Sequence, residues 1–364
     1  MSDTSPTKPA KPATLRRAIL AWYHANRRDL PWRRTDDAYA IWISEAMLQQ
    51  TRVETVIPYW ERFLARVPDP TALATADVDD VLGLWAGLGY YSRARNLHRA
   101  AQEIVERHGG NVPDDVDDLL ALPGVGRYTA GAVASIAFDK PAPLVDGNVE
   151  RVLTRLYGID GEVKSVPVQR RLWDEAAALV EGEEPGALNQ ALMELGATLC
   201  TPRAPRCLAC PWTKHCRAHA EGREEALPVK KRARAAKRVA AAGVWLERDG
   251  KVLAVQRPKE GLLGGLWELP GGDLDAKEDP VAGLARQLEA RLGIEARDVA
   301  AVGSVEHLFT HRRLTLHVFR ATAPPGRIRR VGWDAHRWVS STGFEGLALG
   351  GPTRKALELL AGAP

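Results

Sequence analysis

The chain has 364 residues, of which 45% are hydrophobic and 26% charged, and it carries a formal net charge of +4. This length exceeds what one hydrophobic core usually serves, so we expect two domains. The composition is typical of a soluble globular protein, and no apolar run approaches the roughly 20 residues that a membrane helix needs. We therefore do not expect a membrane protein.

The first 13 residues form a polar segment with no apolar stretch that resembles a signal peptide. This segment, MSDTSPTKPAKPA, contains three Pro and two Lys, a composition typical of a disordered tail. We therefore expect residues 1–13 to be disordered and the protein to be cytoplasmic.

Residues 14–226 follow a helical pattern. Apolar residues recur at spacings of three and four in segments such as AIWISEAMLQQ and RLWDEAAALVEG, which is the period of a helix with one buried face. Because this part contains no strand pattern, we expect an all-α domain.

Two carboxylates in the helical part are candidates for chemistry. Glu45 lies in WISEAMLQQTRV among apolar neighbours, and an apolar setting favours the protonated form of a carboxyl group. A glutamate on a helix is otherwise usually a solvated surface residue. Asp146 precedes the apolar-periodic run GNVERVLTRL, which is the usual position of a helix N-cap. The N-cap role and a functional role are compatible.

Residues 119–138, LLALPGVGRYTAGAVASIAF, are typical of two helices joined by a short turn, a helix-hairpin-helix pattern. Gly124 and Gly126 would let backbone N–H groups approach a phosphate closely, and the second helix adds the positive end of its dipole. The alternative is a simple turn between packed helices. We expect contacts with the DNA backbone, which position a protein without selecting a sequence.

All the cysteines lie in one loop, with the spacing C-x6-C-x2-C-x5-C. They are Cys200, Cys207, Cys210 and Cys216. A disulfide framework would be unusual in a cytoplasmic chain, so metal binding is the better interpretation. Four thiolates suit a structural zinc or an iron–sulfur cluster, and the ligand type alone does not choose between them. Four protein ligands leave no open coordination position on the metal, and the loop that carries them is basic. Both features favour a structural metal over a catalytic one.

A basic segment separates the helical part from the rest of the chain. Residues 227–238 contain six Lys or Arg and no acidic residue, which indicates a solvated linker that can also touch a phosphate backbone.

Beyond this linker, two short apolar runs flank Asp249-Gly250, a strong hairpin signal, and LTLHVFRATA predicts a further strand. We expect residues 239–364 to form a mixed α and β domain.

This second domain contains GDLDAKEDPVAGLARQLEARLGI, residues 272–294, which resembles the helical box of nucleoside-diphosphate hydrolases. Gln287, Ala290 and Arg291 stand where that box has metal-binding glutamates. The remaining carboxylates are too few for a hard divalent cation and pyrophosphate hydrolysis. Leucines at four-residue spacing keep a buried face, so we expect the helix to be structural.

Together, LPGVGRYTAGA, VDGNVERVLTRL and the four-cysteine loop resemble the adenine DNA glycosylase family of the helix-hairpin-helix superfamily. The resemblance implies a multidomain fold. Residues 14–226 would form an all-α helix-hairpin-helix glycosylase domain with an iron–sulfur loop at 200–216, and residues 239–364 an α+β Nudix-like domain related to MutT. It also implies one 4Fe–4S cluster on the four cysteines, and a monomer.

The same resemblance implies an activity and a partner. A monofunctional glycosylase of base excision repair would hydrolyse the N-glycosidic bond of adenine mispaired with 8-oxoguanine or guanine, leaving an abasic site. The partner would be double-stranded DNA containing these mispairs. The second domain would recognise 8-oxoguanine, using a fold related to the enzyme that cleaves oxidised guanine nucleotides.

Site residues follow from the matching motifs. Cleavage of an N-glycosidic bond needs an acid for the leaving base and a fixed carboxylate beside a positive sugar. By resemblance, Glu45 is that acid and Asp146 that carboxylate. The resemblance also assigns Trp32, Arg33 and Gln190 to the adenine pocket. It assigns Gln50 and Thr51 to contact with the oxoguanine strand and Tyr90 to intercalation between bases. Phe309, Thr310 and His311 would contact 8-oxoguanine, with Thr310 in place of the family's serine.

Tyr128 decides between two reaction types. Relatives resembling endonuclease III carry a lysine here, whose amine attacks the sugar and forms a Schiff base, whereas a phenol cannot form an imine. We therefore expect a monofunctional enzyme. The alternatives are a glycosylase-lyase of the endonuclease III type acting on oxidised pyrimidines, a nucleotide pyrophosphatase, and a non-catalytic DNA-binding module.

Overall fold

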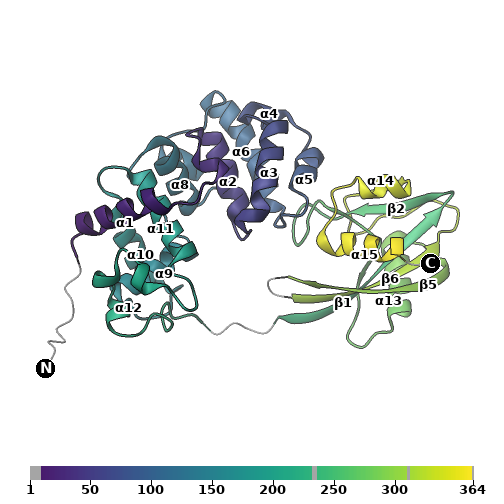
Figure 1. Ribbon diagram of the computed structural model, residues 1–364. Coiled ribbons are helices and arrows are strands. Elements are labelled where there is room, and N and C mark those ends of the chain that lie inside the picture. Colours follow the sequence, from purple (N-terminus) through teal and green to yellow (C-terminus); the bar gives the residue numbers. More distant parts are fainter. Residues whose placement is uncertain (1–9, 232–235, 310–311, 363–364) are drawn as a thin grey trace. The chain divides into compact units, whose positions relative to one another are not determined.

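The computed structural model describes residues 10–231, 236–309 and 312–362 (Figure 1). The chain divides into two compact units. The first comprises Met1–Ala76 and Asn96–Arg232, and the second comprises Asp77–Arg95 and Ala233–Pro364. The short segment 77–95 thus groups with the C-terminal part of the chain. In the described ranges, every helix is too short or too polar to cross a membrane.

The first unit is built from helices, as the apolar spacing predicts. They are α1 (Pro12–Asn26), η1 (Pro31–Arg33), α2 (Ala38–Leu48), α3 (Val53–Arg66), α4 (Pro70–Thr75), α6 (Ser92–His108), α7 (Val116–Ala121), α8 (Arg127–Phe138), α9 (Gly147–Tyr157), α10 (Val166–Val180), α11 (Pro185–Thr198), η2 (Cys207–Ala209), η3 (Thr213–His215) and α12 (Arg217–Ala220). Helix α1 begins inside the segment expected to be a tail, because proline is well suited to the first turn of a helix.

One hydrophobic core joins α1, α9, α10 and α11. Its fully buried members include Leu15, Leu153, Leu172 and Leu192. Helices α9 and α11 approach closely where Gly196 faces Asn148, since a Cβ on this glycine would lie 2.6 Å from the Asn148 Cβ. This contact places the beginning of α9, and Asp146 directly before it, beside α11.

Helices α7 and α8 form the expected hairpin around Gly124. Gly124 has a φ of +78°, and a Cβ there would lie 2.5 Å from the Cβ of Asn96 on α6. Gly126, the N-cap of α8, has a φ of −100° and open space around a Cβ. The fold therefore requires glycine at the first position and tolerates a side chain at the second.

The second unit is built on a seven-stranded mixed sheet (Figure 1). Its strands are β1 (Lys237–Arg248), β2 (Lys251–Gln256), β3 (Trp267–Glu268), β4 (Gly271–Asp273), β5 (Arg297–Leu308), β6 (Arg312–Thr322) and β7 (Ala335–Val339). The strand order is β3-β2-β1-β6-β5, with β4 paired to β1 and β7 to β2. Only β1 and β6 pair in parallel among the described strands. The hairpin predicted at Asp249-Gly250 is confirmed, because it joins β1 to β2.

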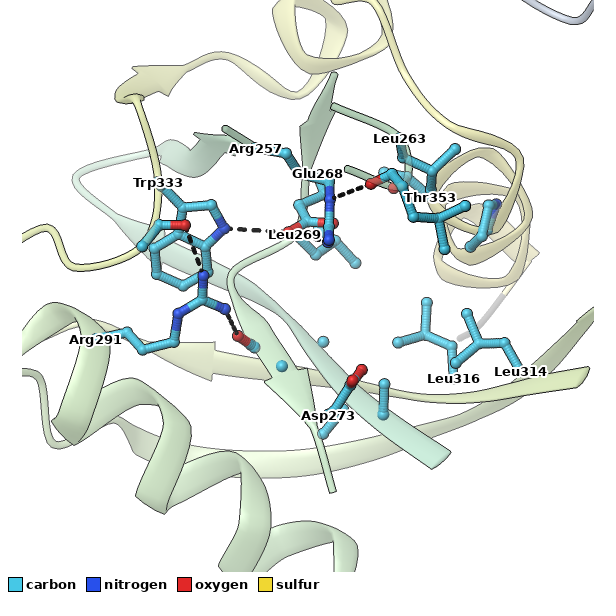
Figure 2. A pocket seen from close by; sticks show the side chains of 18 of the residues that line it. Arg257, Leu263, Glu268, Leu269, Asp273, Arg291, Leu314, Leu316, Trp333 and Thr353 are labelled. Carbon is cyan, nitrogen blue, oxygen red and sulfur yellow. Dashed lines mark hydrogen bonds and ion pairs between the residues drawn. The ribbon is translucent and has the colours of Figure 1, made fainter. Parts of the chain in front are cut away.

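Helices cover both faces of this sheet (Figure 1). The helices of the unit are α5 (Val78–Trp85), α13 (Pro280–Leu292), α14 (Ser341–Glu345) and α15 (Gly351–Gly362). The predicted leucine face of α13 packs against Val244 and Leu246 of β1. Phe344 of α14 and Leu360 of α15 pack with Trp245 on the other face, because successive strand residues point to opposite sides. A pocket of 280 Å³ lies beside β4 (Figure 2).

We expect Gly124→Ala to destabilise the first unit and Gly126→Ala to leave its stability almost unchanged. A side chain at the first position meets Asn96 and is held in a left-handed conformation, which costs about 1–3 kcal/mol. Thermal unfolding followed by the helical circular-dichroism signal measures the difference. Equal melting temperatures for the two variants would contradict this explanation of the hairpin.

Candidate active site

A cavity of 180 Å³ lies within the first unit, lined by residues of η1, α2, α3, α8, α9 and α11 and of the loops between them. It brings together residues that the motifs single out at widely separated positions of the chain. They are Trp32, Arg33, Glu45, Thr51, Tyr128, Asp146 and Gln190. The cavity is therefore the candidate active site.

Glu45 lies on α2, a helix buried on nearly all sides because its residues are mostly apolar. Glu45 is 4% exposed, and the Tyr128 hydroxyl donates a 2.5 Å hydrogen bond to its Oε2. Burial raises the pKa of Glu45 to about 7; the hydrogen bond from Tyr128 opposes this rise, and the charge of Asp146 adds to it. Glu45 is therefore close to half protonated near neutral pH, in line with its apolar sequence neighbours.

Asp146 is the N-cap of α9, which confirms that reading of the sequence. Its Oδ1 accepts hydrogen bonds from the backbone N–H groups of Asn148 (2.9 Å) and Val149 (2.7 Å), and its Oδ2 accepts one from the Asn148 side-chain amide (3.0 Å). Burial raises the pKa of Asp146, and these hydrogen bonds oppose the rise. The result is a carboxyl group that lines the cavity and is held rigidly by the helix it starts.

A buried carboxylate with two arginines forms one wall of the cavity. Glu194 of α11 is 1% exposed and accepts hydrogen bonds from Arg28 (2.8 and 2.9 Å) and Arg33 (2.9 Å). Burial alone would raise the pKa of Glu194, but the two guanidinium groups outweigh it and the pKa is lowered. The sequence reasoning missed Glu194 and Arg28. The available signal was that Glu194 follows Gln190 by four residues and so shares its helix face.

Tyr23 of α1 positions two of the predicted pocket residues. It is fully buried, its hydroxyl donates to Gln190 Oε1 at 3.1 Å, and the Arg33 guanidinium lies 5.5 Å from its ring centre. Because Oε1 of Gln190 accepts the hydrogen bond from Tyr23, the side-chain N–H groups of Gln190 are available as donors to a group bound in the cavity.

Hydrogen bonds connect Asp146 to the cysteine loop through Arg151 of α9. The Arg151 guanidinium donates to Asn148 Oδ1 at 2.9 Å and to the backbone carbonyl of Cys200 at 2.6 Å. The amide of Asn148 in turn donates to Asp146. One helix therefore spans the distance between the cavity and the four cysteines.

The four cysteines lie near one another in the loop after α11, and none of them forms a disulfide bond. Burial raises the pKa of Cys207 to about 11, and Glu224 adds more to this rise than the other cysteines do. Burial also raises the pKa of Cys210 to about 12, and the charges of the other cysteines add to it. A bound cation reverses this cost, because thiolates are the ligand form of cysteine. The guanidinium of Arg155, 3.3 Å from Cys200 Sγ, adds a positive charge beside the set. This donor set fits a metal centre with thiolate ligands.

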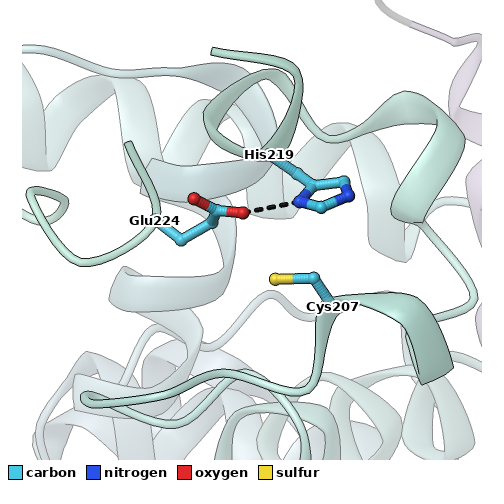
Figure 3. A group of neighbouring side chains, drawn as sticks. All are labelled: Cys207, His219 and Glu224. Atoms are coloured by element: carbon cyan, nitrogen blue, oxygen red, sulfur yellow. Dashed lines mark hydrogen bonds and ion pairs between the residues drawn. The ribbon is translucent and has the colours of Figure 1, made fainter. Parts of the chain in front are cut away.

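A histidine and a glutamate lie at the edge of the cysteine loop (Figure 3). The ligand atoms of Cys207, His219 and Glu224 lie within 4.8 Å of one another, and His219 Nδ1 is 2.5 Å from a Glu224 oxygen. Because Glu224 interacts with both His219 and Cys207, and Cys207 belongs to the four-cysteine set, we assign the His219–Glu224 pair a supporting role beside that set.

Other predicted contact residues lie outside the cavity. Gln50 is exposed directly after α2 and has a φ of +58°. Tyr90 belongs to the second unit, is 46% exposed and has a φ of +48°. Phe309 also belongs to the second unit and lines its pocket. Thr310 and His311 lie outside the described residues.

The box glutamate that remains in the second unit is engaged by an arginine. Glu278 accepts two hydrogen bonds from Arg286, at 2.8 and 2.7 Å, and this partner lowers the pKa of Glu278 to about 2. Its carboxylate is thus part of an ion pair on the protein surface.

Arg291 replaces a box glutamate with a fixed cation (Figure 2). Its guanidinium donates to the carbonyls of Gly271 (2.8 Å) and Gly332 (3.0 Å) and lies 3.4 Å from the ring centre of Trp333. A positive charge therefore lies at the pocket wall on the side of α13, where the box would present carboxylates, and it opposes binding of a divalent cation.

The burial of Glu45 predicts a pH-dependent stability. The pKa of Glu45 is about 7 in the folded protein and has its ordinary value of 4.5 in the unfolded chain. Between these pH values the folded protein binds more protons than the unfolded chain, so the free energy of unfolding falls as the pH rises. We expect Glu45→Gln, which cannot ionise, to exceed the parent in unfolding free energy by up to about 3 kcal/mol above pH 7 and to match it near pH 4.5.

Chemical unfolding at the two pH values measures this effect. Glu61→Gln, at an exposed position of α3, is the matched control and should show no such gain. A stability difference for Glu45→Gln that is independent of pH would show that Glu45 is ionised in the folded state at neutral pH.

Known proteins resemble this chain over most of its length. The HhH-GPD superfamily of base excision DNA repair proteins matches residues 43–177, and the NUDIX domain matches residues 241–359. The adenine DNA glycosylase of Rattus norvegicus is 37% identical over 94% of this chain and 77% of its own length, and that of Homo sapiens is 36% identical over 97% and 75%. The solved structure of a thermostable thymine-DNA glycosylase is 32% identical, with a TM-score of 0.53 over 58% of this chain and 97% of its own.

These similarities confirm the fold class predicted from the motifs, a helix-hairpin-helix glycosylase domain followed by a Nudix-like domain. The first match contains Glu45, Tyr128 and Asp146, and the second contains the box helix α13. Identity above 30% over most of both chains leaves one assignment: the chain belongs to the adenine DNA glycosylase family.

Proposed function

We propose that the protein is a monofunctional DNA glycosylase of base excision repair, which hydrolyses the N-glycosidic bond of adenine mispaired with 8-oxoguanine or guanine. The observation that carries this proposal is a protonatable Glu45 and a rigidly held Asp146 in one buried cavity. Relatives that are named adenine DNA glycosylases support adenine as the base. Because the cavity is enclosed by helices, the nucleotide must leave the base stack to enter it.

Glu45 acts as the general acid in this proposal. Its pKa of about 7 keeps a large fraction protonated at neutral pH, so it can give a proton to a ring nitrogen of adenine as the bond to the sugar breaks. The carboxylate that results can then accept a proton from the water that attacks C1′. A proton donor of this kind contributes about 10²- to 10⁴-fold in rate.

Asp146 stabilises the positive charge that develops on the sugar when the base leaves. Three hydrogen bonds fix its carboxylate at the start of α9, so no reorganisation is needed during the reaction. A carboxylate about 4 Å from a unit positive charge gains about 4 kcal/mol at an effective dielectric constant near 20, which is about a thousandfold in rate.

Tyr128 holds Glu45 and excludes a second reaction type. Its hydroxyl donates to Glu45 and limits the rise in the pKa of that carboxyl group, which keeps the acid matched to neutral pH. A phenol at this position cannot form a Schiff base with the sugar, so the reaction ends at an abasic site.

The remaining cavity residues select the base. Gln190 offers amide N–H groups and Arg33 is anchored by Glu194, so hydrogen-bond donors are fixed in place. Trp32 is 6% exposed and adds a flat apolar wall. This combination fits a planar base with ring-nitrogen acceptors, and purines have more of these than pyrimidines.

The cysteine set would hold one 4Fe–4S cluster through Cys200, Cys207, Cys210 and Cys216. The thiol chemistry of the set and the adjacent guanidinium of Arg155 support an anionic metal centre. When bound, the cluster supplies a rigid cross-link that orders a loop with little secondary structure of its own. Arg151 then ties this loop to the helix that starts after Asp146.

The second unit would recognise 8-oxoguanine in the DNA without hydrolysing nucleotides. Phe309 packs edge-to-face against His307, at 4.6 Å between ring centres, which presents an aromatic group at the loop that the family resemblance assigns to the lesion. The engagement of Glu278 by Arg286 and the position of Arg291 support a domain that keeps the fold and has lost the metal-dependent reaction.

We expect Glu45→Gln and Asp146→Asn each to lower single-turnover excision by at least about a hundredfold, since each removes one of the two charge-handling groups. Duplexes containing adenine opposite 8-oxoguanine, adenine opposite guanine, thymine glycol, or no lesion test the activity and the substrate class together. Asp174→Asn, at an exposed position of α10, is the matched control. Binding of the mispaired duplexes should remain, because the substituted groups are small and uncharged.

Near-parental turnover by either variant would overturn the roles of the two carboxylates. Excision of thymine glycol in preference to adenine would instead overturn the assigned substrate.

Tyr128 generates a separate prediction about covalent chemistry. We expect borohydride to trap no covalent adduct between the parent protein and DNA, and Tyr128→Lys to yield one, because only an amine forms an imine with the opened sugar. Denaturing gel electrophoresis of the reduced reaction mixture measures the adduct. Efficient trapping with the parent protein would show that another residue, a lysine or the N-terminus, supplies a nucleophile.

A further inference from the structure

Helix α9 carries a buried guanidinium on the side of the cysteine loop. Arg155 is 2% exposed and is among the largest fully enclosed side chains of the described chain. It donates to the backbone carbonyls of Leu227 (3.0 Å), Thr201 (2.7 Å) and Pro202 (3.3 Å) and to Cys200 Sγ (3.3 Å). These four acceptors hold the guanidinium in one orientation.

The acceptors satisfy the hydrogen-bonding capacity of Arg155 but do not balance its charge. Across residues 10–231, no carboxylate forms an ion pair or hydrogen bond with this guanidinium. A guanidinium group stays protonated in proteins, and a buried charge without a compensating charge is strongly unfavourable. The position therefore calls for an anion beside it.

Cysteine sulfurs are the groups there that become negative when they bind a metal. Cys200 Sγ is a direct partner of the guanidinium, at 3.3 Å. Four thiolates carry more negative charge than the metal core they hold contributes in positive charge, so an occupied cysteine set is an anion. Arg155 and the set are thus matched in charge and in position.

We propose that Arg155 is the buried counter-charge of the cluster and sets both its reduction potential and its retention, an inference that rests on the proposed 4Fe–4S cofactor. Arg155 is a positioning residue with an electrostatic role and has no contact with the cavity. Adding one electron from an electrode makes the cluster more negative, so a fixed positive charge favours the reduced form and raises the potential.

The competing explanation is that Arg155 only bridges backbone carbonyls of the loop and the segment that follows it. Three substitutions separate charge from bridging. Arg155→Met removes both, Arg155→Gln removes the charge but keeps an amide donor, and Arg155→Lys keeps the charge but loses the planar fork. Arg203→Met, at an exposed position of the same loop, is the matched control for a lost surface charge.

The test uses the full-length protein, with iron, sulfide and zinc content, visible absorption, protein-film voltammetry and the rate of cluster loss to an iron chelator. We expect Arg155→Gln and Arg155→Met to shift the reduction potential to more negative values and to lose the cluster about 10- to 100-fold faster. Arg155→Lys should stay near the parent potential while losing the cluster faster. Arg203→Met should match the parent in both readouts.

Each outcome decides one question. A parent protein that contains zinc in place of iron and sulfide would overturn the proposed cofactor, independently of Arg155. A parent with the cluster and neutral variants with an unchanged potential would overturn the electrostatic role, even if the cluster is lost faster. If Arg155→Met does not fold, Arg155→Gln and Arg155→Lys provide the same comparison of neutral and charged side chains.

Discussion

The hydrogen bonds that Asp146 accepts at the start of α9 constrain most of the site. They satisfy N–H groups of the first helical turn, and they hold the carboxylate at one place in the cavity wall. The same helix reaches the cysteine loop through Arg151 and Arg155. The carboxylate proposed to act in catalysis and the proposed metal centre therefore share one rigid helix, and displacement of the loop would be transmitted to Asp146 by direct hydrogen bonds.

The cavity is assembled at the expense of stability. Glu45 is enclosed on an apolar helix with its pKa raised by burial, and Glu194 is enclosed with two arginines that compensate its charge. The contrast explains their different proposed roles. A carboxyl group with strong cationic partners stays ionised and serves as an anchor, whereas one with a neutral phenol as its partner retains a proton that it can donate.

In the second unit, the box helix is held by contacts that do not involve the box glutamates. Helix α13 is capped by Asp279 and ends at Gly293 in a left-handed conformation, and its leucine face is buried under the sheet. None of these features needs metal ligands. The helix therefore forms without the box glutamates. Arg291 donates a hydrogen bond to a nearby carbonyl, and its guanidinium lies over the ring of Trp333. The pocket that remains has a fixed cation in its wall.

Local patterns in the sequence determined the helices of the first unit, the Asp249-Gly250 hairpin and the cap at Asp146, because caps, turns and apolar period act over a few residues. The sequence also showed that the four cysteines lie in one short segment. Motif resemblance added Glu45, Tyr128 and the family. Glu194, Arg28, Tyr23 and Arg155 escaped notice, since buried charges and hydroxyls look like surface residues until their distant partners are known. Only the tertiary structure decided which polar side chains lose contact with water. This loss of solvent raises the pKa of Glu45 to about 7 and makes Arg155 a buried cation.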